Sequence, residues 1–290
     1  MCGIVGYLGR GTAQESLVDG LRRLEYRGYD SAGVAFHEGD EFSLSRETGR
    51  VENLANAVRA SSSSSSLGIA HTRWATHGAV TVSNTHPHLS QDGKFVLVHN
   101  GVIENFGTLK RFLCSKGISF SSETDSEVLC NLIAYHYSEL PDDEDRFVDA
   151  VRLALPKCRG AYGIAVLCLD YPEVMIGARR GSPLVVGLGD EANFIASDAS
   201  AFVGRAKEAV FLNDGEIAVL DKGGFRITTL EGQDAQAVTH PLDQILEEVE
   251  LGDFDSYMEK EIFEQPTALE NTLRGRFGDD GTTAKLGGLE

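Results

Sequence analysis

Short apolar runs that follow one another at close spacing are the feature of this sequence that most restricts its fold. Each run has the length of a strand and is bounded by glycine or polar residues. Strands joined by such short connections pair antiparallel, whereas parallel neighbours need long crossovers. The runs therefore predict antiparallel sheets, and they read CGIVGYL, SAGVAFH, LGIAHT, KFVLVHNG, AYGIAVLCL, EVMIGARR, SPLVVGLG, NFIASD and EIAVL.

Helical periodicity marks residues 12–28, 123–140 and 145–155. In each stretch, apolar side chains recur three and four positions apart, which places them on one face of a helix. Gly28 is expected to end the first helix as a C-terminal cap. Sheets with helices packed outside them predict an α+β layered domain.

Composition and charge exclude several classes of function. The chain has 290 residues, with 44 acidic against 26 basic side chains and a formal net charge of -18. This balance argues against nucleic acid or an anionic membrane as a partner held by a basic surface. No apolar stretch approaches the ~20 residues that span a membrane. The first residues also lack the pattern of a secretory signal.

The five cysteines are odd in number, and no two stand at CxxC spacing. Neither a disulfide framework nor a zinc site is therefore indicated. We expect a protein of the reducing cytoplasm.

A change in residue composition and strand pattern near residue 230 predicts the domain organisation. Residues 231–251 are acidic and show no clear strand pattern, and the last ~40 residues are too few to bury a core of their own. We expect one domain over residues 2–230. Residues 231–290 are then a linker and the start of a further domain that is absent here. The serine run 61–66 is expected to form a flexible surface loop.

Cys2 is the first residue with a candidate chemical role. Methionine is readily removed before a small residue, and a mature Cys2 would then carry both a thiol and an α-amine. Their ordinary pKa values, about 8.5 and about 7.7–8.0, allow proton transfer between them near neutrality. One residue would thus supply nucleophile and base. A cysteine at this position is also often incidental.

Asn100-Gly101, within FVLVHNGVIEN, supports two interpretations. Asn-Gly between apolar runs is the usual signature of a two-residue hairpin turn, and the residues alone favour that interpretation. A tight turn would also expose the Gly101 N–H beside the Asn100 amide. Two convergent donors of this kind suit the oxyanion of an acyl transfer.

Arg73 and Trp74 lie in the polar segment AHTRWATHGAVTVSNTHPH, where a core role is not expected. Arginine is the natural bidentate partner of a carboxylate. Histidines crowd the same segment, so a metal site is an alternative. No histidine pair stands on a predicted helix with a third ligand in register, and we expect no metal.

Thr124 and Asp125 precede the helical pattern of SSETDSEV, and either could cap that helix. The alternative for Asp125 is a carboxylate beside a pocket, placed to bind an ammonium group. The spacing does not separate the two.

Taken together and in order, these segments resemble the class II glutamine amidotransferases, and in particular the members that pass ammonia to fructose 6-phosphate. The likeness runs from Met1 to about residue 275, and EYRGYDSAG and RWATHG are specific to those members. The segments that carry it are MCGIVGYLG, LRRLEYRGYDSAG, AHTRWATHG, THPH, VHNGVIEN, SETDSEV, RGAYGIAV, GSPLVVGLG and FIASD.

The resemblance implies a four-layer αββα sandwich with mostly antiparallel sheets, the fold of N-terminal nucleophile hydrolases. Cys2, exposed by loss of Met1, would attack the side-chain amide of glutamine, with its own α-amine relaying the proton through water. Asn100 and the Gly101 N–H would form the oxyanion hole, and Gly101 would also contact the substrate.

The resemblance also implies which residues bind the substrate. Arg73, assisted by Thr76 and His77, would hold the α-carboxylate of glutamine, and Asp125 would hold its α-ammonium group.

Supporting roles follow from the same resemblance. Trp74 would belong to a mobile loop over the site that helps to control the passage of ammonia. Arg27 would pack near the nucleophile, with His86 close by. No cofactor is implied.

The resemblance implies glutamine hydrolysis by this chain, with L-glutamine as its substrate. Transfer of the ammonia to fructose 6-phosphate, giving glucosamine 6-phosphate, would need sugar-isomerising domains that are absent here. The longer enzyme would be a homodimer. Two alternatives stay open: an amidotransferase with another ammonia acceptor, and a non-catalytic module that senses glutamine.

Overall fold

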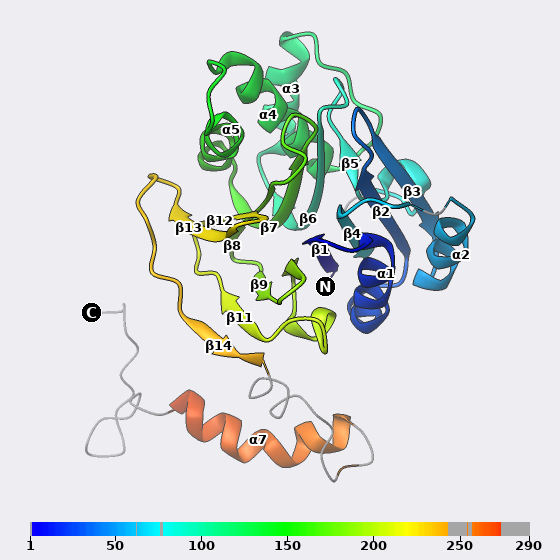
Figure 1. The fold of residues 1–290 in the computed structure, drawn as a ribbon, viewed down its shortest axis with the longest axis vertical. Helices are drawn as coiled ribbons and strands as arrows, with labels where there is room; N and C mark the ends of the chain where they lie inside the picture. Colours follow the sequence, from blue (N-terminus) through cyan, green and yellow to red (C-terminus); the bar gives the residue numbers. More distant parts are fainter. Residues whose placement is uncertain (1, 62, 76–77, 243–253, 255–256, 274–290) are drawn as a thin grey trace. The chain divides into compact units, whose positions relative to one another are not determined.

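The computed structural model describes residues 2–61, 63–75, 78–242, 254 and 257–273 (Figure 1). The chain divides into two compact units, Met1–Ile245 and Leu246–Glu290. The second unit contains helix α7 (Tyr257–Leu273). All other elements below belong to the first unit.

Within the described residues, the first unit is built on an eight-stranded and a six-stranded sheet. Their strand orders are β14-β11-β9-β10-β1-β4-β2-β3 and β13-β12-β8-β7-β6-β5, and the paired strands are antiparallel. The strands are β1 Gly3–Gly9, β2 Ser31–His37, β3 Phe42–Thr48, β4 Leu67–Arg73, β5 His88–Leu89, β6 Phe95–Ile103, β7 Gly160–Cys168, β8 Met175–Arg180, β9 Val185–Leu188, β10 Ala192–Ala196, β11 Glu208–Phe211, β12 Glu216–Asp221, β13 Gly224–Thr229 and β14 Thr239–Pro241.

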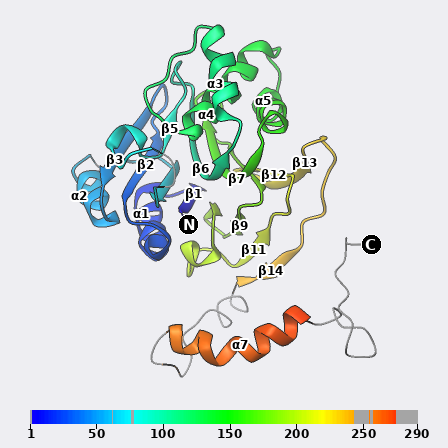
Figure 2. The ribbon, with the colours of Figure 1, turned by 180° about the vertical axis from the view of Figure 1, so that it is seen from behind.

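Helices cover the outer faces of the sheets (Figures 1 and 2). Against the eight-stranded sheet, α1 packs on β1 and β4, and α2 packs on β2 and β3; against the other sheet, α4 packs on β5 and β6 and contacts α3 and α5. The helices are α1 Ala13–Leu24, α2 Val51–Ser61, α3 Phe106–Ser115, α4 Asp125–Glu139 and α5 Arg146–Ala154, and the 3₁₀ turns are η1 Glu25–Arg27, η2 Val82–Asn84, η3 Leu155–Lys157 and η4 Ala199–Phe202.

Strand β6 shows how the layers are held together. Phe95 and Leu97 join the apolar cluster shared with the helices of the six-stranded sheet. Val96 and Val98, which point the other way, join the cluster between the two sheets. This alternation is the period of two expected of a strand buried on both faces. The α+β layered architecture predicted from the sequence is confirmed.

The structure corrects the turn predicted at Asn100-Gly101. β6 runs through both residues, and Asn100 pairs with Gly163 of β7. Asn-Gly is a local signal for a turn, whereas the apolar run continues to Ile103 and pairs along its whole length with β7. Pairing between distant strands therefore overrides the local preference.

Gly28 does not cap α1 as predicted. The helix ends at Leu24, η1 follows, and Gly28 has an extended backbone with φ 179°. The reason for a glycine here is space, because a Cβ atom would lie 2.7 Å from the carbonyl carbon of Arg73 and 2.8 Å from the nitrogen of Trp74.

The serine run is less of a surface loop than its composition predicts. Ser65 is buried, and its hydroxyl donates to the backbone oxygen of His37 over 2.8 Å. The short serine side chain thus satisfies a backbone acceptor at the end of β2. Strand β14, in turn, comes from a stretch where the sequence shows no strand pattern.

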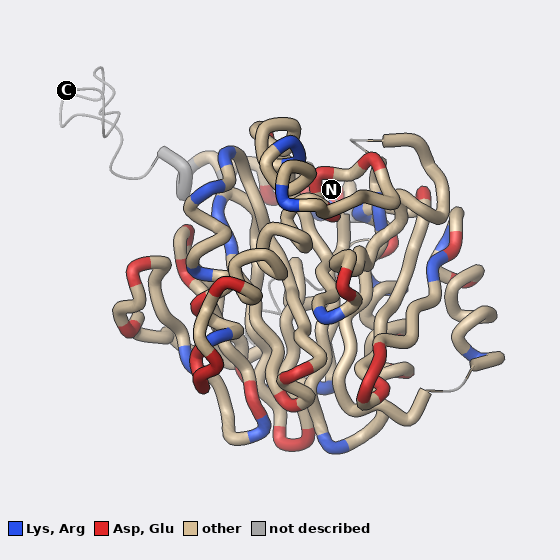
Figure 3. Tube along the Cα trace, turned by 90° about the horizontal axis from the view of Figure 1, so that it is seen from above, with Lys and Arg blue, Asp and Glu red and all other residues tan. Residues whose placement is uncertain are grey.

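Acidic and basic residues are interspersed along the described chain (Figure 3). Among the described residues, no helix has the length and apolar character needed to cross a bilayer.

Candidate active site

Cys2 lies directly before β1. In the eight-stranded sheet, β1 has β4 on one side and β10 on the other. Gly3 pairs with Thr72, so the register places Cys2 beside the end of β4. There the backbone N–H of Trp74 donates to the Cys2 sulfur over 3.2 Å. The thiol is therefore positioned by backbone groups rather than by another reactive side chain.

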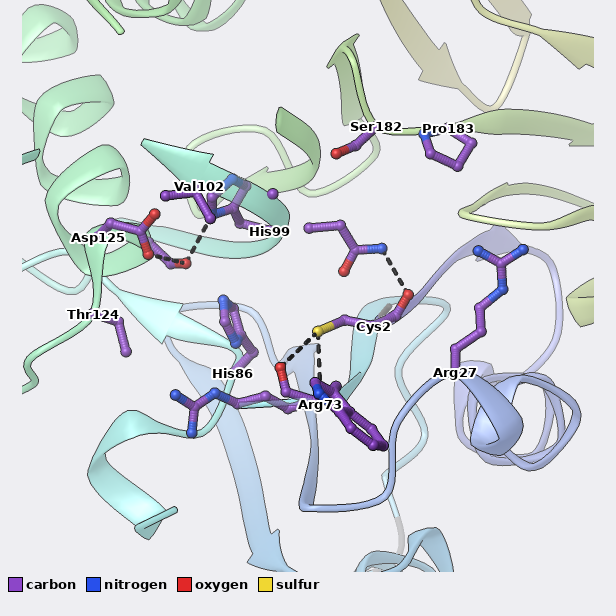
Figure 4. Close-up of a pocket in the computed structure, with 14 residues that line it drawn as sticks. Cys2, Arg27, Arg73, His86, His99, Val102, Thr124, Asp125, Ser182 and Pro183 are labelled. Carbon is purple, nitrogen blue, oxygen red and sulfur yellow. Dashed lines mark hydrogen bonds between the residues drawn. The ribbon is translucent and has the colours of Figure 1, made fainter. Parts of the chain in front are cut away.

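A pocket of about 210 Å³ lies beside this thiol (Figure 4). Both sheets and the start of α4 contribute to its wall. Its lining residues are Cys2, Arg27, Arg73, Trp74, His86, His99, Asn100, Gly101, Val102, Thr124, Asp125, Ser126, Ser182 and Pro183. The main residues singled out from four separate sequence segments thus meet in one place.

Asn100 and Gly101 bring β6 to the thiol. The Asn100 side-chain nitrogen donates to the backbone oxygen of Cys2 over 2.9 Å. Gly101 has φ +126°, and a Cβ there would lie 2.1 Å from the oxygen of Ala161. The position therefore admits only glycine, because any side chain would meet the backbone of β7.

Arg73 is buried at the end of β4. Its guanidinium donates to the backbone oxygens of Ala79 and Gly78 over 3.2 and 3.4 Å. These contacts fix the cation at the pocket wall, where it would attract a carboxylate.

Asp125 is the buried first residue of α4. Thr124, rather than Asp125, caps the helix, because the Thr124 hydroxyl accepts from the backbone nitrogen of Glu127 over 3.2 Å. The Asp125 carboxylate instead accepts from the backbone nitrogen of Ile103 over 2.7 Å and faces the pocket (Figure 4). An anion held in this way can bind an ammonium group.

The supporting residues Arg27, Trp74 and His86 also line the pocket. Trp74 is 45% exposed and packs edge-on against Tyr29 at 5.5 Å between ring centroids. Arg27 forms an ion pair with Asp198. His86 is buried. Thr76 and His77, the predicted helpers of Arg73, lie outside the described residues.

Residues 53–143 match the family model of the glutamine amidotransferase domain. The chain is 46% identical to the glutamine–fructose-6-phosphate aminotransferase (isomerizing) of Thermus thermophilus, over 99% of this chain and 46% of that protein. It is 44% identical to the protein of the same name from Chlorobaculum tepidum, over 100% of this chain and 47% of that protein. The chain therefore contains a glutamine amidotransferase domain.

A solved structure resembles this amidotransferase as well. The glutamine phosphoribosylpyrophosphate amidotransferase from B. subtilis, in complex with ADP and GMP, matches with a TM-score of 0.67 and 26% identity, over 79% of this chain and 49% of that one. The predicted N-terminal nucleophile fold is thereby confirmed. The amidotransferase spans about half the length of the curated relatives it matches.

The thiol of this amidotransferase has a raised pKa. Burial raises the pKa of Cys2, while the Trp74 N–H and the charge of Arg73 lower it and the charge of Asp30 raises it further. Because burial prevails, Cys2 is a protonated thiol at neutral pH. A base must therefore remove its proton before it can act as a nucleophile.

A cluster of buried histidines adjoins the pocket, which His86 and His99 also line: His71, His86, His88 and His99. The rings of His71 and His86 are 4.1 Å apart, and those of His86 and His88 are 4.7 Å apart. Burial lowers the pKa of all of these side chains, that of His71 to about 3. Among the described residues, no group of His, Cys, Asp or Glu is arranged to hold a metal ion.

Sequence reasoning missed several residues that build this site. Asp30 accepts from the backbone nitrogen of Ala75 over 2.8 Å and so holds the segment after β4. His71 stands two residues before Arg73, and a period of two would have placed both on one face of that strand. Ser182 and Pro183 line the pocket from the distant segment between β8 and β9. Their segment, GSPLVVGLG, carries part of the family resemblance, but its residue pattern does not by itself indicate a place in the pocket.

Proposed function

We propose that this chain hydrolyses L-glutamine to L-glutamate and ammonia through a thioester on Cys2. The observation that carries the proposal is that Cys2, Asn100, Gly101, Arg73 and Asp125 line one pocket. A nucleophile, amide donors, a cation and an anion are thus available to a substrate that has a side-chain amide, an α-carboxylate and an α-ammonium group.

In the first half of the reaction, the Cys2 sulfur bonds to the amide carbon of glutamine, and the thiol proton passes to the α-amine that loss of Met1 exposes. The carbonyl oxygen takes up the electron pair and is stabilised by the Asn100 amide and the Gly101 N–H. When the C–N bond breaks, the α-amine returns the proton to the leaving nitrogen, and ammonia departs.

In the second half, water attacks the thioester carbon, and the α-amine again accepts a proton. The C–S bond breaks, the sulfur regains its proton, and glutamate leaves. Arg73 and Asp125 hold the α-carboxylate and α-ammonium group throughout, so the reacting amide stays beside the sulfur.

Ammonia release from glutamine tests the proposal, after intact mass has established that Met1 is removed. Cys2→Ala should abolish ammonia release. Cys114→Ala, which changes another cysteine that is exposed on α3, should leave the activity unchanged. Rapid quenching followed by mass spectrometry should find glutamate bound to Cys2 in the parent chain.

Activity that survives in Cys2→Ala would disprove the role of Cys2. Glutamine binding without any ammonia release would instead identify a sensing module.

Within a longer protein, we propose that this chain is the glutamine-hydrolysing half of an enzyme that gives glucosamine 6-phosphate from fructose 6-phosphate. The names and lengths of its relatives support this assignment. On this proposal, residues 2–230 are the glutaminase domain and 231–290 lead to the sugar-isomerising half. The whole enzyme is a cytoplasmic homodimer that binds neither nucleic acid nor membranes.

Incubation of this chain with glutamine and fructose 6-phosphate should therefore give ammonia but no amino sugar. Amino sugar formed by this chain alone would contradict the division of labour between the two halves.

A further inference from the structure

The side chain of Asn100 is held at both ends. Its nitrogen donates to the backbone oxygen of Cys2 over 2.9 Å, and its oxygen lies 3.0 Å from Nε2 of His71. His71 is 1% exposed, on β4 of the opposite sheet. Strand β4 therefore carries Arg73 in the pocket wall and His71 behind the wall, in contact with the proposed oxyanion donor.

Hydrogen-bond chemistry fixes the direction of both contacts. A backbone oxygen only accepts, so the amide nitrogen of Asn100 must face Cys2 and the amide oxygen must face His71. An amide oxygen also only accepts, and Nε2 of His71 must therefore carry the hydrogen. One amide hydrogen of Asn100 is engaged by Cys2, and the second has no acceptor among the described residues.

Burial keeps this arrangement intact over the working range of pH. Because burial lowers the pKa of His71 to about 3, the ring is neutral, and Nε2–H stays a donor without a nearby positive charge. A 180° flip of the amide would set its oxygen against the oxygen of Cys2 and its nitrogen against the Nε2 hydrogen. Both contacts would become repulsive.

We propose that His71 is a positioning residue that fixes the amide of Asn100, so that one amide hydrogen is directed at the oxyanion formed during glutamine hydrolysis. This inference rests on the proposed function. His71 itself touches neither the substrate nor the sulfur, and acts through Asn100.

Substitutions that keep or remove the Nε2 donor test this role. His71→Leu removes the donor and should lower kcat for glutamine hydrolysis by about ten- to a hundredfold, less than the 10²–10³ typical for loss of an oxyanion donor. KM should change by no more than about twofold, because Arg73 and Asp125 are untouched. His71→Gln, whose amide nitrogen reaches the place of Nε2, should recover most of the activity.

Two further variants serve as controls. His71→Asn is polar but too short to reach Asn100, and it should be as slow as His71→Leu. If His71→Leu does not fold, the role of His71 is tested by comparing kcat of His71→Gln with kcat of His71→Asn. His37→Leu removes another buried histidine, whose Nε2 lies 3.1 Å from the oxygen of Leu169, and should leave kcat unchanged.

Coupling to Asn100 separates positioning from a general structural effect. In an Asn100→Ala background, His71→Leu should lower kcat by no more than about twofold, because the group it positions is already absent. Alkylation of Cys2 by iodoacetamide displaces iodide without forming an oxyanion. Its rate, followed by peptide mass spectrometry, should be the same in His71→Leu as in the parent.

Several outcomes would overturn the inference: a kcat of His71→Leu within about twofold of the parent, an equal loss in both backgrounds, or slower alkylation of Cys2. A parent chain that releases no ammonia from glutamine would overturn the proposed function as well. An active parent with an unaffected His71→Leu variant would overturn this inference alone.

Discussion

At the residue scale, groups that do not react hold the polar side chains of the pocket in place. Arg73 is held by backbone oxygens, Asp125 by the nitrogen of Ile103, and Asn100 by His71 and the oxygen of Cys2. Side chains fixed in this way need little reorganisation when charge develops on a substrate. The proposed roles of these residues therefore lead to distinct kinetic effects.

Replacing Asn100 with alanine should slow turnover more than it weakens substrate binding. Loss of one oxyanion donor typically lowers kcat by about 10²–10³. KM for glutamine should change little, because the α-groups are bound elsewhere in the pocket. Steady-state ammonia release measures both constants, with Asn53→Ala, an exposed asparagine, as the matched control. An unchanged kcat would contradict the assignment.

Alkylation of Cys2 should need a higher pH than alkylation of an ordinary cysteine. Only the thiolate reacts, and burial raises the pKa of Cys2, so its midpoint should lie above that of a cysteine at the start of an unstructured peptide. Rates with iodoacetamide between pH 6 and 10, followed on the Cys2 peptide, give the midpoint. An unstructured cysteine peptide serves as the reference, and a midpoint below that of the peptide would refute the prediction.

At the scale of elements, the site forms where strand ends from both sheets meet the start of a helix. β1 delivers Cys2, β4 delivers Arg73 and the Trp74 N–H, β6 delivers Asn100, and α4 delivers Asp125. The segment that follows η1 packs closely against the end of β4 at Gly28. The position of the Cys2 sulfur therefore depends on how tightly these backbones approach.

Gly28→Ala should destabilise the fold and slow the reaction together. The added methyl group would meet the Arg73 and Trp74 backbones at 2.7–2.8 Å, and overpacking of this kind typically costs about 1–3 kcal/mol. Any relief moves the Trp74 N–H away from Cys2 and should lower kcat. Urea unfolding and ammonia release measure the two effects.

Gly11→Ala is the matched control, because its nearest atom, the Tyr7 hydroxyl, would be 3.4 Å away. Equal stability of the two variants would show that the close packing at Gly28 has no energetic consequence.

At the scale of the whole first unit, two sheets close over buried histidines. His71 comes from β4 and His99 from β6, and His86 between them has no hydrogen-bond partner on either ring nitrogen among the described residues. Burial keeps these side chains neutral. Protonation of these histidines therefore disfavours the folded state, in which they are buried.

The free energy of unfolding should fall as the pH drops below about 6.5. In the unfolded chain these histidines bind a proton near pH 6.5, whereas in the folded chain the pKa of His71 is about 3 and those of the other histidines are lowered. The unfolded state thus binds more protons between these values. The contribution of these histidines to the free energy of unfolding is fully present above pH 6.5. Below that pH it declines by about 1.4 kcal/mol per pH unit for each such histidine.

Urea unfolding at pH 5, 6 and 7 measures this slope. His86→Phe leaves no hydrogen bond broken among the described residues and should reduce the slope by about one proton. A free energy of unfolding that is constant from pH 7 to pH 5 would contradict the prediction.

The sequence by itself determined most elements and the family: short apolar runs indicated most strands, a period of 3.6 residues indicated the helices, and the order of the motifs pointed to an amidotransferase domain. These signals are local, or depend on order along the chain. Tertiary structure decided that Asn100-Gly101 lies inside β6, that Gly28 serves close packing, and that Asp30 and His71 support the site. Such contacts join residues from distant elements, and they exist only once long-range strand pairing has set the register of the sheets.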